Sequence, residues 1–228
     1  DKQERVWIYT RTDHPLMIFE RDGSFVRSWG EGIVSDAHGI CLDAQDNLFM
    51  VDRNAQVAVK FTANGDKVFE LGNRDQPSDS GWTDESRTVL RAAEPFHHPT
   101  DIALSANGDV YVSDGYRNAR VHKFSGDGKL ILSWGEPGEG DGQFNLPHSV
   151  WEAKGRVYVA DRQNNRLQVF TPQGEHLETW PGFLQPCKIF VDGADIMYVA
   201  ELGLRVTICS LDGTILARLG GEQGTAPG

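Results

Sequence analysis

The feature of this sequence that most limits its possible folds is an internal repeat of roughly 40 residues. Its clearest copy, residues 145–170, has a Pro-His pair at the start of a strand, a second strand, an Asp-Arg pair and a third strand. The same order recurs from Ala37, Pro99 and Pro186. A glycine-bearing turn and a fourth apolar run follow each copy, at residues 68–71, 130–134, 176–180 and 215–219. Because such a unit cannot bury its strands alone, we expect the copies to stack around an axis as blades of a β-propeller.

The copies predict an all-β, six-bladed propeller in a single domain spanning residues 1–228. Four full copies and a partial copy at residues 6–30 account for about five blades. The chain begins almost directly in a strand and stops in residues 224–228, so we expect the sixth blade to be divided between segments outside this sequence. The polar stretch 73–96 exceeds ordinary loop lengths and is compatible with a lid or with an inert insertion.

Composition excludes several classes of partner. The formal net charge of −11 argues against nucleic acid, because binding phosphate requires a basic face. No apolar run approaches the length of a membrane span, and no signal peptide is visible. The three cysteines lie far apart in strand patterns without zinc-binding spacing, so we interpret them as small buried thiols.

His38 and His148 occupy the same position in two copies, at the start of the innermost strand, where the other copies have Thr100 and Cys187. Alternate blades of a six-bladed ring lie about 120° apart, so three such histidines would converge on one axial point. Three imidazoles with an open position form a catalytic zinc site, and the third histidine would lie beyond Gly228. An equally open alternative is that each imidazole only hydrogen-bonds a neighbouring blade. Cys187 is in the wrong blade to be a ligand.

The turns after the second strands are expected to gather at the mouth of the channel. They carry Arg11, Arg53, Tyr116 and Arg162. Converging arginines suit a carboxylate substrate, since a guanidinium binds a carboxylate in a bidentate manner. Tyr116 beside a metal could act as a general base. The alternative for each arginine is a solvated turn or an ion pair with one of the acids Asp52, Asp114 and Asp161.

The repeats resemble NHL repeats, and residues 99–170 are similar to peptidyl-α-hydroxyglycine α-amidating lyase. The motifs that carry this resemblance are Ser-Asp-Gly-Tyr at 113–116 and Pro-His-Ser at 147–149. Members of that family are six-bladed propellers with a zinc ion on three histidines and a structural calcium on backbone carbonyls and an Asp. Arg117 stands where the animal enzymes have a disulfide cysteine, so the chain looks more like the bacterial relatives.

The resemblance implies a role for each matching residue. His38 and His148 match zinc ligands, and Ile40 matches a residue that offers its carbonyl to calcium. Tyr116 matches the catalytic tyrosine, while Arg11 and Arg162 match active-site arginines, with Arg53 as a further substrate-binding candidate. The implied reaction cleaves the carbinolamide C–N bond of a C-terminal α-hydroxyglycine, or of a related small carboxylate, to give an amide and glyoxylate.

Two other functions compete with the lyase. A non-catalytic NHL scaffold would bind a protein partner on one propeller face, without zinc. A calcium-dependent, lactonase-like hydrolase would need Glu, Asn and Asp near the axis, which His38, Thr100, His148 and Cys187 do not provide. On the lyase reading the substrate is a small molecule or a peptide C-terminus, and the protein is a monomer. The resemblance favours a secreted or periplasmic location.

Overall fold

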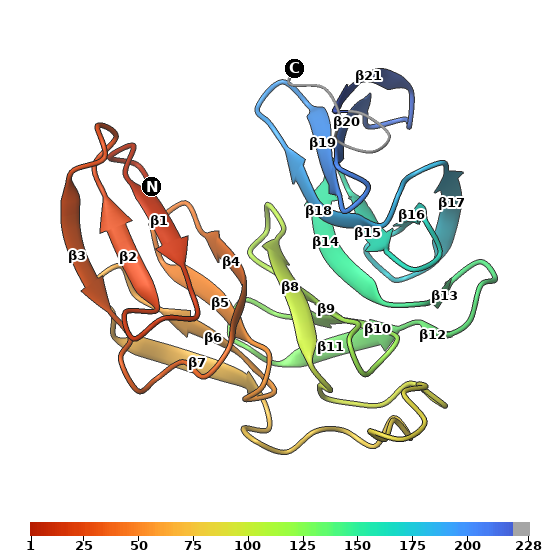
Figure 1. The fold of residues 1–228 in the computed structure, drawn as a ribbon, viewed down its shortest axis with the longest axis horizontal. Helices are drawn as coiled ribbons and strands as arrows, with labels where there is room; N and C mark the ends of the chain where they lie inside the picture. Colours follow the sequence, from red (N-terminus) through yellow and green to blue (C-terminus); the bar gives the residue numbers. More distant parts are fainter. Residues whose placement is uncertain (221–228) are drawn as a thin grey trace.

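The computed structural model describes residues 1–220 and places them in five antiparallel sheets that follow one another along the chain (Figure 1). The first sheet has three strands: β1 (Val6–Tyr9), β2 (Leu16–Phe19) and β3 (Phe25–Trp29). The second has four: β4 (Ala37–Leu42), β5 (Leu48–Asp52), β6 (Val57–Phe61) and β7 (Lys67–Gly72). The third contains β8 (Pro99–Leu104), β9 (Val110–Asp114), β10 (Arg120–Phe124) and β11 (Leu130–Trp134).

The two remaining large sheets have the same order of four strands. The fourth contains β14 (Pro147–Ala153), β15 (Arg156–Asp161), β16 (Arg166–Phe170) and β17 (His176–Pro181). The fifth contains β18 (Pro186–Val191), β19 (Ile196–Glu201), β20 (Arg205–Ser210) and β21 (Ile215–Gly220). Between the third and fourth sheets, β12 (Glu136–Pro137) and β13 (Gln143–Phe144) form a short parallel pair.

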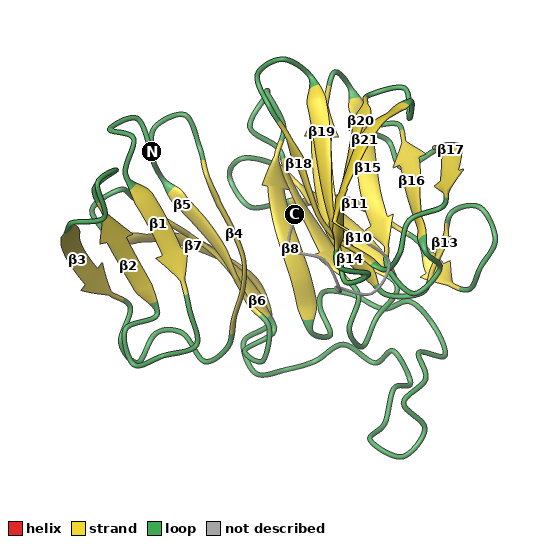
Figure 2. Cartoon of the chain, turned by 45° about the horizontal axis from the view of Figure 1, so that its top comes forward, coloured by secondary structure: helices red, strands yellow, loops and turns green. Residues whose placement is uncertain are grey.

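The sheets stand around a common axis with their first strands innermost, as in a propeller, and the prediction of an all-β propeller is confirmed (Figures 1 and 2). Five blades are present in the described residues, and the predicted sixth is not among them. The sheets of β1–β3 and β18–β21 stand apart in both views. The expected start of another blade at residues 224–228 lies outside the described part. Within residues 1–220 no helix forms, so none could cross a membrane.

Apolar cores lie between neighbouring sheets because the alternating faces of each strand meet the next blade. One core joins the third and fourth sheets through Tyr111, Val121 and Phe170. Another joins the fourth and fifth sheets through Tyr158 and Ile189. The rigid packing of consecutive blades holds the inner strands in fixed positions, and this sets the geometry of everything at the axis.

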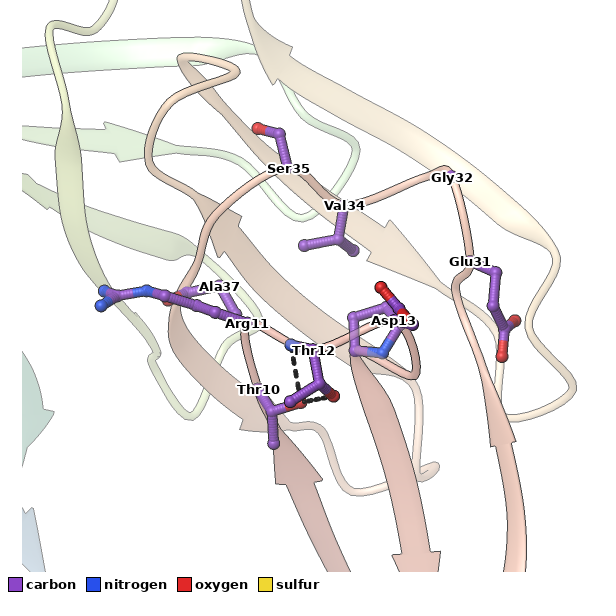
Figure 3. A pocket seen from close by; sticks show the side chains of 10 residues that line it. Thr10, Arg11, Thr12, Asp13, Glu31, Gly32, Val34, Ser35 and Ala37 are labelled. Carbon is purple, nitrogen blue, oxygen red and sulfur yellow. Dashed lines mark hydrogen bonds between the residues drawn. The ribbon is translucent and has the colours of Figure 1, made fainter.

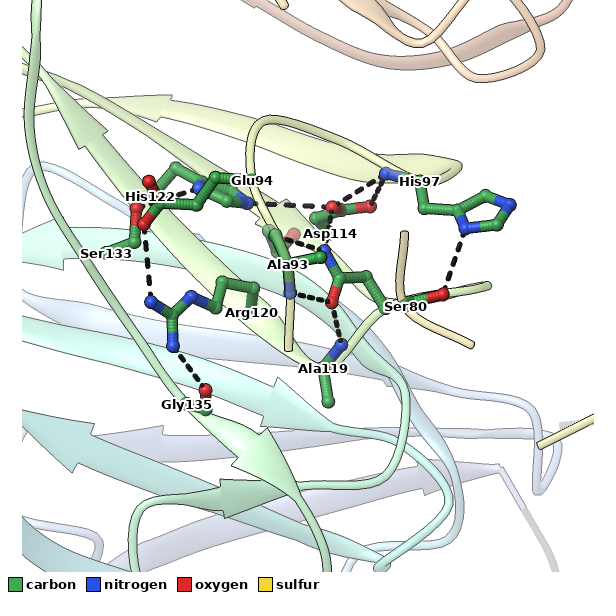
Figure 4. Close-up of polar contacts among 12 residues, drawn as sticks. Ser80, Ala93, Glu94, His97, Asp114, Ala119, Arg120, His122, Ser133 and Gly135 are labelled. Atoms are coloured by element: carbon green, nitrogen blue, oxygen red, sulfur yellow. Dashed lines mark hydrogen bonds and ion pairs between the residues drawn. The ribbon is translucent and has the colours of Figure 1, made fainter. Parts of the chain in front are cut away.

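In each four-stranded sheet, one acidic residue at the end of the second strand anchors the loop before the inner strand. Asp52 accepts hydrogen bonds from the main-chain N–H groups of Ser35 and Asp36, and Asp161 accepts one from that of Asn145. Asp114 does the same for His97, as Figure 4 shows. These acids therefore hold loops in place. They do not form ion pairs with Arg11, Arg53 or Arg162, which was one of the two alternatives expected for those arginines.

Candidate metal and active site at the propeller axis

The inner strand of each four-stranded sheet contains a β-bulge near its start, at the same position of the sequence repeat. In the third, fourth and fifth sheets the residue left without a partner is Thr100, His148 or Cys187. In the second sheet two residues, His38 and Gly39, oppose one. A bulge takes its residue out of the ladder and redirects its side chain. The repeated Pro-His or Ala-His pair therefore marks a bulge at the axis.

His38 and His148 are held in one tautomer by main-chain carbonyls. The Nδ1–H of His38 donates to the carbonyl of Thr100 at 2.5 Å, and that of His148 donates to the carbonyl of Cys187 at 2.7 Å. A carbonyl only accepts, so Nδ1 carries the hydrogen in both neutral rings and Nε2 carries a lone pair. A hydrogen bond from the ring nitrogen that does not face the metal is the usual way in which proteins orient a metal-binding imidazole. The ring centroids are 5.1 Å apart.

Tyr116 lies between the two lone pairs. Its hydroxyl oxygen is 3.2 Å from Nε2 of His38 and 3.1 Å from Nε2 of His148. A single hydroxyl hydrogen can be donated to only one imidazole at a time, so the other lone pair has no donor among residues 1–220. Two convergent nitrogen lone pairs beside a phenol oxygen suit a cation of the zinc type.

Gly115 allows Tyr116 to reach this point. A Cβ at position 115 would lie 2.2 Å from the carbonyl oxygen of Pro147, which is closer than any side chain tolerates. The turn after β9 therefore packs directly on the start of β14, next to His148. The main-chain N–H of Tyr116 also donates to the carbonyl of His98 at 3.4 Å, which ties the turn to the start of β8.

Burial keeps both imidazoles neutral. Desolvation lowers the pKa of His38, and the interaction with Thr100 opposes that shift only in part. Desolvation and then the positive charge of Arg162 lower the pKa of His148 to about 4. Near neutral pH both Nε2 atoms are thus free of protons, which is the state that a metal ligand requires.

Two of the predicted arginines face the tyrosine. The guanidinium carbon of Arg53 is 5.0 Å from the centroid of the Tyr116 ring, and that of Arg162 is 5.3 Å from it. The Nε of Arg162 is buried without a hydrogen-bond partner among the described residues, and its side chain has no ion pair there. Arg162 is therefore the guanidinium that remains available for an anionic ligand.

Arg11 and Arg53 are joined by one acid, Asp36, whose side chain is only 5% exposed. Arg11 binds one carboxylate oxygen and Arg53 the other, each at 2.5 Å. Arg11 is one of the residues that line a pocket of about 430 Å³. Figure 3 shows its guanidinium directed away from Asp13 and Glu31. Asp36 thus orients both arginines and offsets part of their charge.

The described residues could supply two ligands of a zinc site. His38 and His148 fit as two ligands by tautomer, protonation and convergence, while no group of three or more metal-binding side chains gathers within residues 1–220. For calcium, Ile40 lies in β4, paired with Met50, and could offer the carbonyl that the resemblance implies. Asp101, which packs against Gly39, is already bound by the ammonium of Lys188 at 2.6 and 2.8 Å.

The connector between β7 and β8 has neither helix nor strand and is fixed to the turn that carries Tyr116. The guanidinium of Arg117 stacks on the Trp82 ring at 3.7 Å, and Arg117 also faces Asp84 at 3.6 Å. Figure 4 shows a contact within the connector, in which Ser80 hydrogen-bonds the His97 ring, while the main-chain N–H of His97 donates to Asp114 at the end of β9. Arg117 thus ties the connector to the active-site turn non-covalently.

Sequence reasoning missed two residues at the mouth, Asp36 and His98. Desolvation, followed by the charge of Arg117, lowers the pKa of His98 to about 4. Both residues immediately precede the inner strand, where the other copies have Leu146 and Gln185. The only signal for them in the sequence was a titratable residue at a repeat position where the other copies have an apolar or neutral one.

Comparison with known proteins agrees with the fold. Residues 96–124 match the NHL repeat family. NHL repeat-containing protein 3 of Homo sapiens is 34% identical over 216 residues, covering 87% of this chain and 59% of that protein. Peptidyl-alpha-hydroxyglycine alpha-amidating lyase 1 of Drosophila melanogaster is 30% identical over 168 residues, covering 68% of this chain and 29% of that protein. The chain therefore spans less than two thirds of the length of these curated relatives.

Solved structures show the same architecture at low sequence identity. A streptogramin B lyase structure superposes with a TM-score of 0.72 at 15% identity, covering 97% of this chain and 67% of that one. A nidogen/laminin complex gives a TM-score of 0.67 at 13% identity, covering 94% of this chain and 79% of the other. At these identities the likeness concerns the fold alone. The chain is thus a β-propeller that carries an NHL repeat match at residues 96–124 and is similar in sequence to NHL repeat-containing protein 3 and to the peptidyl-alpha-hydroxyglycine alpha-amidating lyases.

Proposed function

We propose that the protein is a zinc-dependent lyase that cleaves the C–N bond of a C-terminal α-hydroxyglycine or of a closely related small carboxylate. The observation that carries this proposal is the position of the Tyr116 oxygen between two uncharged Nε2 atoms, with Arg162 beside it. The sequence relatives named as amidating enzymes support the same class of reaction.

His38 and His148 would hold the metal, and zinc bound there would supply a Lewis acid for the substrate's hydroxyl group. Arg162 would bind the substrate carboxylate, because its guanidinium has no protein partner in the described residues. Arg53 also lies against the Tyr116 ring and adds positive charge. Asp36 holds Arg53 and Arg11 in place. Carbonyl groups fix both imidazoles, so the residues that meet the substrate are already oriented before it binds.

Tyr116 is the residue that we propose to move the proton. Its oxygen accepts the proton of the substrate's α-hydroxyl group as the carbonyl of glyoxylate forms, and its own hydroxyl proton passes to the departing amide nitrogen as the C–N bond breaks. Tyr116 is a phenol before and after the step, so no external acid, base or oxidant is needed. The products are a peptide amide and glyoxylate, and the charge on the carboxylate stays with Arg162 throughout.

The test is release of glyoxylate from a peptide that ends in α-hydroxyglycine, measured against the spontaneous rate. We expect release that a chelator abolishes and that added zinc restores. Tyr116→Phe keeps the ring against Arg53 and Arg162 but removes the hydroxyl, so we expect it to lower kcat by about 10²–10⁴-fold. Leu130→Ser, an exposed change on β11, serves as the control.

A scaffold without catalysis is the second candidate, favoured by the long match to NHL repeat-containing protein 3, which covers more of this chain than the lyase match does. It predicts no zinc in the purified protein and no effect of His148→Ala on binding of a partner. If the purified protein contained zinc but released no glyoxylate, the metal site would stand and the proposed substrate would be wrong. Absence of both would favour the scaffold.

A further inference from the structure

The turn that carries Tyr116 lies outside the ladder of its own sheet. The pairing of β9 with β10 ends at Asp114 and Arg120, so residues 115–119 take no part in it. A close contact with the Pro147 carbonyl fixes the first residue of this turn. The position of the Tyr116 hydroxyl between two imidazoles therefore depends on what holds the rest of the turn.

The residue after Tyr116 is held by the connector between β7 and β8. The guanidinium carbon of Arg117 lies 3.7 Å from the centroid of the Trp82 ring, which is a close cation–π contact. The acid that this guanidinium faces, Asp84, is 3.6 Å away and its side chain is 87% exposed, so water screens the ion pair. Trp82 is therefore the stronger of these two side-chain partners of Arg117.

Trp82 is itself fixed to the end of β9. Its main-chain N–H donates to the hydroxyl of Ser80 at 3.4 Å, and that hydroxyl hydrogen-bonds the His97 ring at 3.0 Å. The main-chain N–H of His97 donates to the carboxylate of Asp114, the last residue of β9, at 2.9 Å. A closed chain of contacts thus runs from β9 through the connector and back to the residue after Tyr116.

A second attachment joins the connector to the same turn. Asn118 is 1% exposed, and its side-chain amide donates to the carbonyl of Ala93 at 2.8 Å and accepts from the N–H of Ala93 at 3.2 Å. The same amide donates to the Asp114 carboxylate at 2.8 Å. The connector is therefore attached on both sides of Trp82 in sequence, at Ser80 and at Ala93, which limits how far the indole can move away from Arg117.

We propose that Trp82 is a positioning residue, which fixes the turn through Arg117 and so holds the Tyr116 hydroxyl between the two imidazoles. The inference rests on the proposed function for the chemical role of Tyr116, while the placement of the turn can be tested without it. A change at Trp82 removes neither imidazole nor the guanidinium of Arg162. It should therefore slow the chemical step and leave binding of the substrate carboxylate intact.

The first measurement is glyoxylate release by the full chain from a peptide that ends in α-hydroxyglycine. We expect Trp82→Ala to lower kcat by about 10–100-fold, with KM within about twofold of the parent value. Trp82→Phe keeps an aromatic face for Arg117 and should retain most of kcat. Asp84→Asn is the matched control, because it removes only the screened ion pair, and it should behave as the parent chain does. A raised KM at unchanged kcat in Trp82→Ala would make Trp82 a substrate contact and overturn the proposal.

A second variant covers the case in which Trp82→Ala does not fold. Arg117→Lys leaves the indole in place, but an ammonium group offers no planar surface to stack on it. We expect the same loss of kcat as in Trp82→Ala. An equal loss in Asp84→Asn would mean that the ion pair holds the turn, and the assignment to Trp82 would be wrong.

Hydrogen–deuterium exchange of the turn gives a readout that needs no activity. The N–H of Arg117 donates to the carbonyl of His97 at 3.2 Å, so its exchange reports on the attachment of the turn. We expect exchange in residues 115–119 to be about 10-fold faster in Trp82→Ala and unchanged in Trp82→Phe. Faster exchange in Trp82→Ala, from a parent chain that releases no glyoxylate, would support the positioning role and reject the lyase. Unchanged exchange in Trp82→Ala would overturn the positioning role whether or not glyoxylate is released.

Discussion

At the scale of single residues, the site depends on which nitrogen of each histidine carries a hydrogen. The carbonyls of Thr100 and Cys187 take the Nδ1 hydrogens of His38 and His148, and this leaves both Nε2 lone pairs directed at Tyr116. Burial and nearby arginines oppose protonation of the same rings. The two effects act together, because a protonated imidazole could neither accept from Tyr116 nor bind a metal.

The lowered pKa of His148 makes stability depend on pH in a definite direction. Its pKa falls from an ordinary 6.5 to about 4 in the folded chain, so the unfolded chain binds a proton more readily between these values. Stability is therefore complete above about pH 6.5 and declines as pH falls toward 4, by up to about 3 kcal/mol from this group. Urea unfolding with chelator present, from pH 7 to pH 4, would measure the decline.

The contribution of His148 is isolated by comparing variants. His148→Gln should flatten the acid limb of the stability curve, because the group that resists protonation is gone. His14→Asn is the control, since His14 is well exposed and lies far from the axis, beside Glu31. An acid limb of equal slope in His148→Gln and in the parent chain would contradict the expectation.

The repeat made some of these residues predictable and hid others. His38 and His148 could be identified because identical positions in two copies must meet at the axis of any propeller. Asp36 and His98 could not, because each occurs in one copy only and the charged neighbours that they meet, Arg11 and Arg117, are distant in sequence. Pairing of Arg11 and Arg53 with Asp36 depends on the packing of two blades, and no single stretch of sequence encodes it.

At the scale of elements, the bulge at the start of the inner strand and the turn after the second strand work as a pair in the four-stranded sheets. The bulge directs His148 inward, and the turn after β9 brings Tyr116 against it. Strand bounds followed closely from alternation; residues 68–71 were predicted where β7 spans Lys67–Gly72. The β12–β13 pair was not predicted, because strands of two residues beside a glycine-rich turn leave no periodic signal.

Gly115→Ala tests the contact between the turn and the next blade. A methyl group there would lie 2.2 Å from the Pro147 oxygen, so either the turn or β14 must move. We expect unfolding to become easier by about 1–3 kcal/mol, with loss of any activity that needs Tyr116 beside His148. Gly193→Ala is the control, because nothing lies within 4 Å of a Cβ at that position. Equal denaturant midpoints for the two variants would reject this account of the turn.

At the scale of the whole molecule, the two histidines come from sheets that are not neighbours. His38 belongs to the second blade and His148 to the fourth, and the third blade separates them in the order around the axis. Thr100 of the intervening blade contributes by accepting from His38 and by donating its hydroxyl to the carbonyl of Pro147 at 2.9 Å. An ion held by both imidazoles would therefore link three blades across the axis.

Zinc should for this reason stabilise the whole propeller, independently of any catalysis. A ligand at 100 times its Kd adds about 2.7 kcal/mol to the folded state, which corresponds to a rise in Tm on the order of 5–10 °C for a chain of this size. Calorimetric scans with zinc and with chelator would measure the shift. His38→Ala removes one of the two ligands and should abolish most of it, whereas His14→Ala should retain it. A zinc-induced shift of the same size in His38→Ala would mean that the ion binds elsewhere, and the pairing of blades two and four through the metal would then be wrong.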